Sequence, residues 1–151
     1  MATLAHTGLT VRDLDRSLGF YRDLLGMRVV MEQEKRGGYL AEIVGYPDAH
    51  VRMVHLELPA GGHRIELFQY LEPAPRGEPS EPCAVGLTHV CILVDDLEAV
   101  FGRLREAGVR SLSGPVLVDT GVNAGASAVY VRDPDGAIVE LCQPPTQGGR
   151  G

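Results

Sequence analysis

The hydrophobic pattern of the chain predicts two matching helices, one in each half. Each begins after an aspartate, a favourable N-cap, and ends at a glycine, which readily adopts the left-handed conformation of a helix end. Asp13 and Gly26 bound the first helix, and Asp96 and Gly108 bound the second. Between these bounds the apolar residues recur at helical spacing, namely Leu14, Leu18, Tyr21 and Leu25, then Leu97, Val100, Phe101 and Leu104. We expect two counterpart helices, the first about three turns long.

Short apolar runs bounded by turn residues predict the strands. One run opens each half, from Leu4 and from Leu87. Six further strands are predicted at Met27 to Lys35, Val51 to Leu58, His63 to Tyr70, Val116 to Asp119, Ala128 to Arg132 and Ala137 to Gln143. Each half therefore has the order strand, helix and three strands. A glycine-containing loop over Thr120 to Ser127 is of the kind that often closes over ligands.

The segment from Glu72 to Val85 separates the two halves. It contains four prolines, which neither a helix nor an interior strand tolerates. We expect one domain over residues 1–151, with a first module at about 4–71, a linker at about 72–85 and a second module at about 86–143. Residues 36–50 are expected to form a loop with a helical turn, and residues 144–151 a frayed tail.

Composition limits the class of protein and of partner. The chain has 151 residues and 44% hydrophobic content, enough for the core of one ordinary domain. Its net charge of −6 argues against nucleic-acid or anionic-membrane binding, because both need clustered Lys and Arg. Three cysteines without a CxxC pair predict neither a disulfide framework nor a thiolate zinc site. With no membrane-spanning run and no signal peptide, we expect a cytoplasmic protein that binds a small molecule.

A histidine and a glutamate recur at matching places in the two halves. His6 and His89 open the first strands, and the aligned positions that follow include Val11 with Val94 and Asp13 with Asp96. Each half also closes on a similar segment after a turn, Glu66-Leu67-Phe68-Gln69 and Glu140-Leu141-Cys142-Gln143. The set of four candidates is His6, Glu66, His89 and Glu140.

The chemistry of these four residues favours a metal site. In the second half, strand alternation places the ionisable groups on the same face as apolar neighbours. Two carboxylates that face one cavity repel each other, and a divalent cation bound by two imidazoles and two carboxylates removes that cost. The nitrogen and oxygen donors suit Zn, Ni, Co, Mn or Fe(II) equally. The alternative is four ordinary strand residues, such as a Glu paired with Arg64, but recurrence in both halves favours the metal hypothesis.

The other histidines and the cysteines carry weaker signals. His50, His55 and His63 have no counterparts in the second half, so they are interpreted as surface or turn histidines. Cys91 and Cys142 each stand two residues from a proposed ligand and are interpreted as small buried hydrophobic residues.

With these residues in place, the chain resembles the vicinal oxygen chelate superfamily. That superfamily includes glyoxalase I, methylmalonyl-CoA epimerase, extradiol ring-cleaving dioxygenases, fosfomycin-resistance enzymes and bleomycin-binding proteins. The resemblance runs from Leu4 to about Pro144. It is carried by His6 to Val30, Ile65-Glu66-Leu67, His89 to Gly108, and Asp133-Pro134-Asp135-Gly136 through Glu140-Leu141.

The resemblance implies an α+β fold of two tandem βαβββ modules whose curved mixed sheet surrounds a metal site. The implied ligands of one divalent ion are His6, Glu66, His89 and Glu140, supplied by one chain or by two. A homodimer is implied as well. A fourth ligand at Glu66 favours the glyoxalase and epimerase branch, because the dioxygenases of the superfamily use only two His and one carboxylate as metal ligands.

The implied activity is an isomerase, epimerase or glyoxalase-like lyase that moves a proton on carbon next to a carbonyl through a metal-bound enediolate. A sugar-like ketone would suit a chain without an obvious basic site, although Arg64, Arg110 or Arg132 could serve as one. Glu140 is the preferred base, Glu66 could return the proton, and the reverse assignment or a third acid such as Glu42 stays open. Two other functions also stay open: an Fe(II) ring-cleaving dioxygenase, and a metal-free antibiotic-binding protein, for which 5% aromatic content offers little stacking surface.

Overall fold

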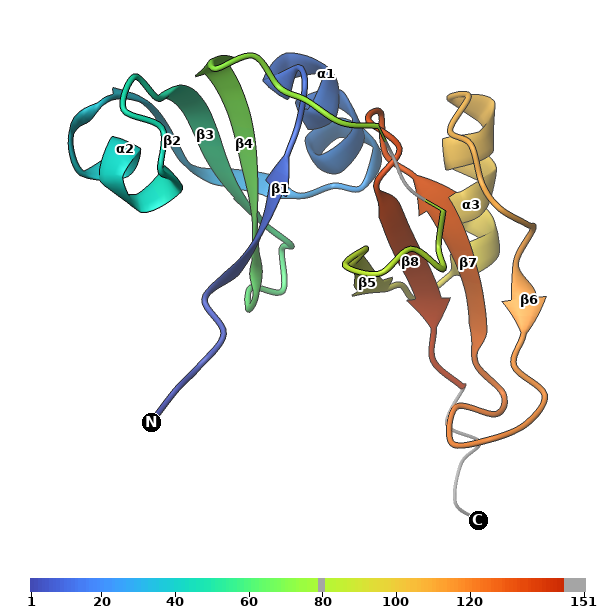
Figure 1. Cartoon of the computed structure of the whole chain (residues 1–151). Coiled ribbons are helices and arrows are strands. Elements are labelled where there is room, and N and C mark those ends of the chain that lie inside the picture. The colour runs from blue at the N-terminus through green and yellow to red at the C-terminus, as the bar shows by residue number, and fades with distance from the viewer. Residues whose placement is uncertain (79–80, 146–151) are drawn as a thin grey trace. The chain divides into compact units, whose positions relative to one another are not determined.

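The computed structural model describes residues 1–78 and 81–145 (Figure 1). Within it the chain divides into two compact units, Met1–Gly77 and Glu78–Gly151. Each unit carries a four-stranded mixed sheet. The predicted α+β fold of two βαβββ modules is confirmed, with one additional helix in the first unit. No helix in residues 1–78 or 81–145 has the length and apolarity needed to cross a membrane.

The first unit has the strand order β1-β4-β3-β2. Strand β1 runs parallel to β4, whereas β4, β3 and β2 are antiparallel to their neighbours. The bounds are β1 His6–Thr10, α1 Leu14–Leu18, η1 Gly19–Leu24, β2 Arg28–Arg36, α2 Gly38–Val44, β3 His50–Glu57 and β4 Arg64–Glu72. The helical turn expected within residues 36–50 is therefore confirmed as α2.

The second unit repeats this topology with the order β5-β8-β7-β6. Strand β5 is parallel to β8, and β8, β7 and β6 are antiparallel. The bounds are β5 His89–Leu93, α3 Leu97–Glu106, β6 Val116–Leu117, β7 Ser127–Arg132 and β8 Ile138–Gln143.

The first helix changes its hydrogen-bond pattern along its length. It begins as expected, because the side chain of Asp13 accepts a hydrogen bond from the backbone N–H of Arg16. Beyond Leu18 the hydrogen bonds widen into a π-helix, in which Leu25 N–H donates to the Phe20 carbonyl. The expected helix of about three turns is therefore present, as α1 followed directly by η1. The wider turn still buries Phe20 and Tyr21.

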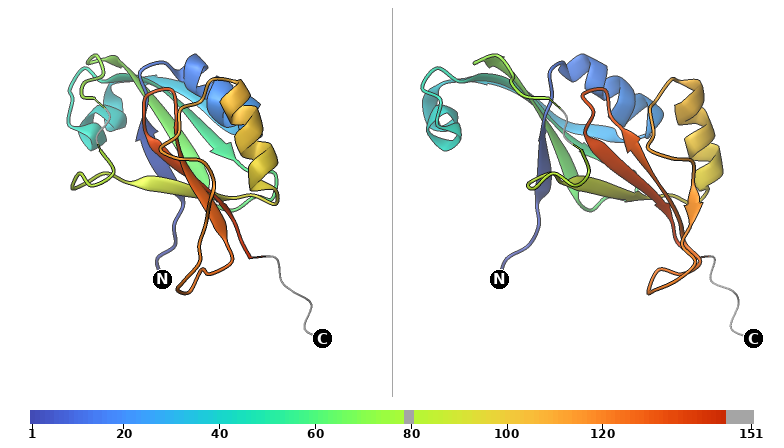
Figure 2. Two further views of the ribbon diagram at one scale, coloured as in Figure 1. Left: turned by 90° about the vertical axis from the view of Figure 1, so that its right-hand side faces the viewer. Right: turned by 45° about the vertical axis from the view of Figure 1, so that its right-hand side comes forward.

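The same hydrogen bond joins helix to sheet in both units. The Gln69 side-chain oxygen, on β4, accepts from the backbone N–H of Leu14 at 3.0 Å, and Gln143 on β8 accepts from Leu97 at 2.9 Å. The first N–H groups of a helix have no partner within the helix, so each glutamine satisfies one of them. Figure 2 shows α1 and α3, each along its own unit's sheet.

The two faces of the first sheet carry different cores. Ile65 and Leu67 of β4 are buried on the α1 side. On the other side Leu40 of α2 packs with Val51 and Met53, and Phe68 and Tyr70 border this cluster. Strand alternation places Glu66 on the same face as Phe68 and Tyr70. The candidate site of this unit therefore lies on the face that α2 partly covers.

Candidate functional site

In the first unit, the structure brings His6 and Glu66 together. His6 opens β1, and Glu66 lies on β4 opposite Gly8. His6 Nε2 is 3.3 Å from Glu66 Oε2. A Cβ on Gly8 would lie 3.6 Å from the same oxygen, so glycine leaves the space over the carboxylate open. The imidazole is 42% exposed and the carboxylate 14%, so the pair is accessible from its imidazole side.

The second unit repeats the pair with His89 and Glu140. His89 opens β5, and Glu140 on β8 lies opposite Cys91. His89 Nε2 is 3.1 Å from Glu140 Oε2. As in the first pair, the imidazole is more exposed than the carboxylate, at 44% against 22%. Equivalent strands thus supply equivalent donors in the two units.

The separation of each nitrogen–oxygen pair fits two ligands of one ion. Atoms that both lie about 2.0–2.2 Å from a divalent ion are about 2.8–3.6 Å apart when their angle is between octahedral and tetrahedral. The observed 3.1 and 3.3 Å fall inside this interval. Each unit therefore holds half of the predicted ligand set. Among the described residues, no group of three or more His, Cys, Asp and Glu side chains is arranged to hold a metal ion, so convergence of all four stays a prediction.

His55 is a site residue that the sequence analysis missed. Its expected place at the surface or in a turn is wrong, because it lies on β3 directly opposite Glu66. Its Nε2 is 2.7 Å from Glu66 Oε1, and its side chain is only 15% exposed. Since a carboxylate oxygen accepts, His55 donates to it. Glu66 is therefore held through both oxygens, one by His55 and one by His6.

Tyr130 occupies the equivalent position in the second unit but makes a different contact. It lies on β7 opposite Glu140. Its hydroxyl is 3.4 Å from His89 Nε2, and the two rings are 5.1 Å apart. Burial raises the pKa of Tyr130, with Glu140 as the next cause, so the phenol remains protonated at neutral pH. The two carboxylates are thus held differently despite their matching positions.

Cys91 and Cys142 are free cysteines on β5 and β8, the first opposite Glu140 and the second two residues after it. Cys91 was expected to be buried, but it is exposed, and Cys142 is half-buried. Partial burial of its thiol, with the Glu140 carboxylate as the next cause, raises the pKa of Cys91 to about 11. Without a bound ion, this thiol therefore stays protonated at neutral pH.

The remaining histidines have partners outside the pairs. Of the two expected at the surface or in turns, His63 lies exposed in a bend before β4, whereas His50 opens β3 and is half-buried. His63 Nε2 lies 2.7 Å from Thr7 Oγ1, and His50 Nε2 lies 2.5 Å from Glu34 Oε1. Arg64, the alternative partner considered for Glu66, lies 3.5 Å from Glu57 instead.

Comparison with known proteins identifies the family. The model of the Glyoxalase/Bleomycin resistance protein/Dioxygenase superfamily matches residues 3–141. The chain belongs to this superfamily. The predicted resemblance to the vicinal oxygen chelate superfamily is thereby confirmed.

Two relatives of this superfamily member are named as enzymes. It is 32% identical to a probable lactoylglutathione lyase of Vibrio parahaemolyticus, over 93% of this chain and 89% of that protein. It is 30% identical to the mitochondrial methylmalonyl-CoA epimerase of Mus musculus, over 95% of this chain and 74% of that protein. A lyase and an epimerase among its relatives support an enzyme of the isomerase or lyase type.

A solved structure supports the fold. The crystal structure of a glyoxalase family protein from Bacillus cereus matches this superfamily member with a TM-score of 0.85. The match covers 97% of this chain and 96% of that one, at 20% identity.

Proposed function

We propose that this chain is a divalent-metal-dependent enzyme that moves a proton on a carbon next to a carbonyl group, as an isomerase, an epimerase or a glyoxalase-like lyase. The observation that carries the proposal is the recurrence of one His–Glu pair per unit at ligand spacing, 3.3 and 3.1 Å. The lyase and epimerase relatives support the reaction type, because both names describe isomerising or eliminating enzymes of one superfamily.

His6, Glu66, His89 and Glu140 would hold the ion, whether one chain supplies all four or two chains supply two each. Nitrogen and oxygen donors suit Zn, Ni, Co, Mn or Fe(II). When bound, such an ion polarises a carbonyl oxygen and makes the neighbouring C–H more acidic. Its positive charge would also compensate the two carboxylates, each of which lies beside an imidazole.

The contacts of the two glutamates support Glu140 as the base that removes the proton. Glu66 accepts from His55 at 2.7 Å through one oxygen and lies 3.3 Å from His6 through the other. Glu140 has His89 at 3.1 Å and the Cys91 thiol, a weak donor, as its neighbours. A carboxylate that must approach and leave a substrate carbon needs such freedom, so Glu140 suits the base and Glu66 the fixed position.

The same contacts leave Glu66 a part in epimerisation. Inversion at carbon needs an acid that returns the proton on the face opposite the base, whereas transfer between adjacent carbons needs one carboxylate only. In an epimerase Glu66 would be this second acid. To reach the substrate carbon it would have to break its hydrogen bond with His55.

Metal analysis and isotope exchange test the proposal. Purified protein loaded with Ni, Zn or Co should retain one ion per set of four ligands, and chelation with EDTA should lower its melting temperature, because an ion that binds only the folded state stabilises it. Turnover of a ketone or hemithioacetal in D₂O should place deuterium on the carbon next to the carbonyl. Retention of less than a tenth of an ion, or consumption of O₂ during turnover, would contradict the proposal, the latter in favour of a dioxygenase.

A further inference from the structure

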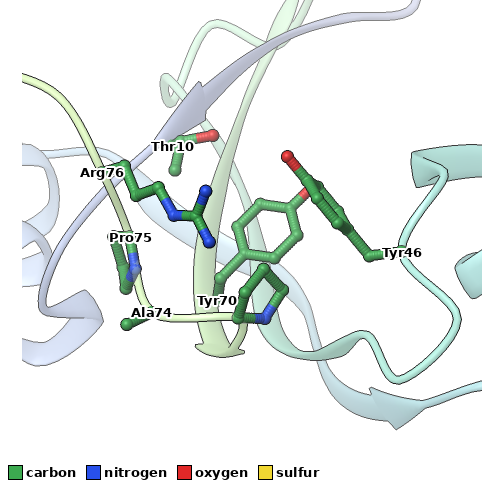
Figure 3. Close-up of a pocket in the computed structure, with 7 residues that line it drawn as sticks. Thr10, Tyr46, Tyr70, Ala74, Pro75 and Arg76 are labelled. Atoms are coloured by element: carbon green, nitrogen blue, oxygen red, sulfur yellow. The ribbon is translucent and has the colours of Figure 1, made fainter.

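A polar pocket lies within the first unit, away from His6 and Glu66. It has a volume of about 310 Å³ and is lined by Thr10, Tyr46, Tyr70 and the segment Pro73 to Arg76 (Figure 3). Thr10 ends β1 and Tyr70 lies near the end of β4, while Tyr46 follows α2. Figure 3 shows the Arg76 side chain passing close to Thr10, with its guanidinium beside the Tyr70 ring.

The lining of this pocket offers hydrogen-bond donors without a carboxylate. Arg76 supplies the single formal charge among the seven lining residues, and two phenols and one threonine supply hydroxyls. Within residues 1–78 and 81–145, Arg76 makes no hydrogen bond or ion pair. Burial raises the pKa of Tyr70, and Tyr46 raises it further, so its phenol stays a neutral donor. In a chain of net charge −6, an uncompensated guanidinium beside hydroxyl donors favours an anionic ligand.

Contacts on either side keep the pocket formed without a ligand. The Arg12 guanidinium donates to the Gly77 carbonyl and so fixes the end of the Pro73 to Arg76 segment. The rings of Tyr46 and Tyr70 meet edge to face, with centroids 6.1 Å apart and planes at 81°. The groups that would contact a ligand are therefore already held in place.

This pocket shares a sheet face with the His6–Glu66 pair. On β4, Glu66 and Tyr70 are four residues apart, and on the parallel β1, His6 and Thr10 are also four apart. At about 3.3 Å per residue, the two places are about 13 Å from each other along the strands. Gly8 and Phe68 lie between them. Between the two places, this face of the sheet therefore presents one glycine, which has no side chain, and one apolar ring.

We propose that the pocket at Tyr46, Tyr70 and Arg76 binds the negatively charged end of an elongated substrate, a carboxylate or a phosphate, whose carbonyl group lies about 13 Å away beside His6 and Glu66. The substrate class is then an extended anionic carbonyl compound with an apolar middle, rather than a compact neutral cyclic ketone. The inference deepens the proposed function and rests on it for the carbonyl end. The anion-binding end rests on the pocket alone.

Direct binding tests the anion end independently of catalysis. Hexanoate, hexyl phosphate and neutral hexanol are titrated into the protein while the NMR signals of the Tyr46 and Tyr70 rings are followed. Both anions should bind more tightly than hexanol, and Arg76→Gln should weaken the anions about ten-fold, the value of one lost charge-assisted hydrogen bond. Arg22→Gln, which removes an exposed arginine paired with Asp23 outside the pocket, is the matched control and should bind as the wild type does.

Paired substrates test the link to the carbonyl end. Hemithioacetals of methylglyoxal are made with mercaptooctanoate and with mercaptooctanol, which have the same length and differ in the terminal charge. The wild type should prefer the carboxylate by kcat/KM, and Arg76→Gln should reduce that preference about ten-fold, with the loss in KM. The hemithioacetal of a shorter anion, mercaptoacetate, should gain nothing from Arg76, because its carboxylate cannot reach across the distance of about 13 Å between the two places.

Each outcome tests one part of the proposal. Equal binding of hexanoate and hexanol, or anion binding unchanged in Arg76→Gln, overturns the anion site. Anion binding that depends on Arg76, together with an unchanged substrate preference in Arg76→Gln, overturns its role in the substrate path. If the wild type turns over none of the hemithioacetals, the glyoxalase-like lyase activity is excluded, and the binding titration alone then upholds or overturns the anion site.

Discussion

His55 and Glu66 face each other across β3 and β4 with 2.7 Å between Nε2 and Oε1. The equivalent residue of the second unit, Tyr130, faces Glu140 but has its hydroxyl 3.4 Å from His89. Two modules with one topology and matching His–Glu pairs therefore hold their carboxylates differently. An internal repeat can in this way supply one fixed carboxylate and one freer carboxylate.

Replacing His55 should reduce metal affinity more than replacing Tyr130. In His55→Phe the Glu66 carboxylate loses the donor that orients it, and loss of such an outer hydrogen bond typically costs about 10–100-fold in affinity. Competition between the protein and a chromophoric chelator for Co²⁺ measures the effect. His55→Gln, which can still donate to Glu66, should recover part of the affinity, and Tyr130→Phe should change it little. Equal losses in the Phe and Gln variants would indicate that packing, not the hydrogen bond, matters at this position.

The two glutamates should respond differently to substitution by glutamine. Glu140→Gln should lower kcat by about 10²–10⁴-fold, the usual contribution of a positioned general base. It should also stop deuterium incorporation from D₂O. Glu66→Gln should mainly weaken metal binding, measured by equilibrium dialysis. Glu98→Gln, on the exposed first turn of α3, is the control for loss of a carboxylate in the second unit. Full turnover in Glu140→Gln would remove it from the reaction.

The N-cap of α3 should contribute measurably to stability. The Asp96 side chain accepts from the backbone N–H of Ala99 at 2.9 Å, so Asp96→Ala leaves a helix-end donor without its partner. A loss of about 1 kcal/mol in the free energy of unfolding is expected. Urea denaturation followed by circular dichroism measures it. Asp95→Ala, at the neighbouring exposed position, should lie within about 0.5 kcal/mol of the wild type.

The turn before β8 should depend on the buried side chain of Asp133. This residue is 3% exposed, and its Oδ1 accepts from the backbone N–H groups of Asp135 and Ala137 at 2.9 and 2.8 Å. Asp133→Ala leaves these two groups without that acceptor, at a cost of about 1–3 kcal/mol. Asp133→Asn keeps an acceptor oxygen and should lose less. A thermal melt of both variants distinguishes them, and the same melting temperature for Ala and Asn would contradict this account.

The sequence determined the elements of the fold and their repetition. Helix caps, glycine stops and strand alternation are local signals, so Asp13, Asp96 and Gly108 could be assigned without knowing what packs against what. The His–Glu pairs were also predictable, because matching positions in two halves that share a topology fall at matching places in their sheets. The division into modules 4–71 and 86–143 with the linker between them stays a prediction, and of the expected tail, residues 146–151 lie outside the described residues.

Tertiary structure alone decided which further residues meet those pairs. His55 reaches Glu66 only because the register of β3 against β4 places them opposite each other, and a shift of one residue would turn His55 to the other face. The pocket around Arg76 likewise joins Thr10, Tyr46 and Tyr70 from three separate elements. The spacing of apolar residues in the first helix likewise does not indicate its change to a π-helix after Leu18. These features depend on strand register and on packing between distant segments, and neither leaves a periodic signal in a single sequence.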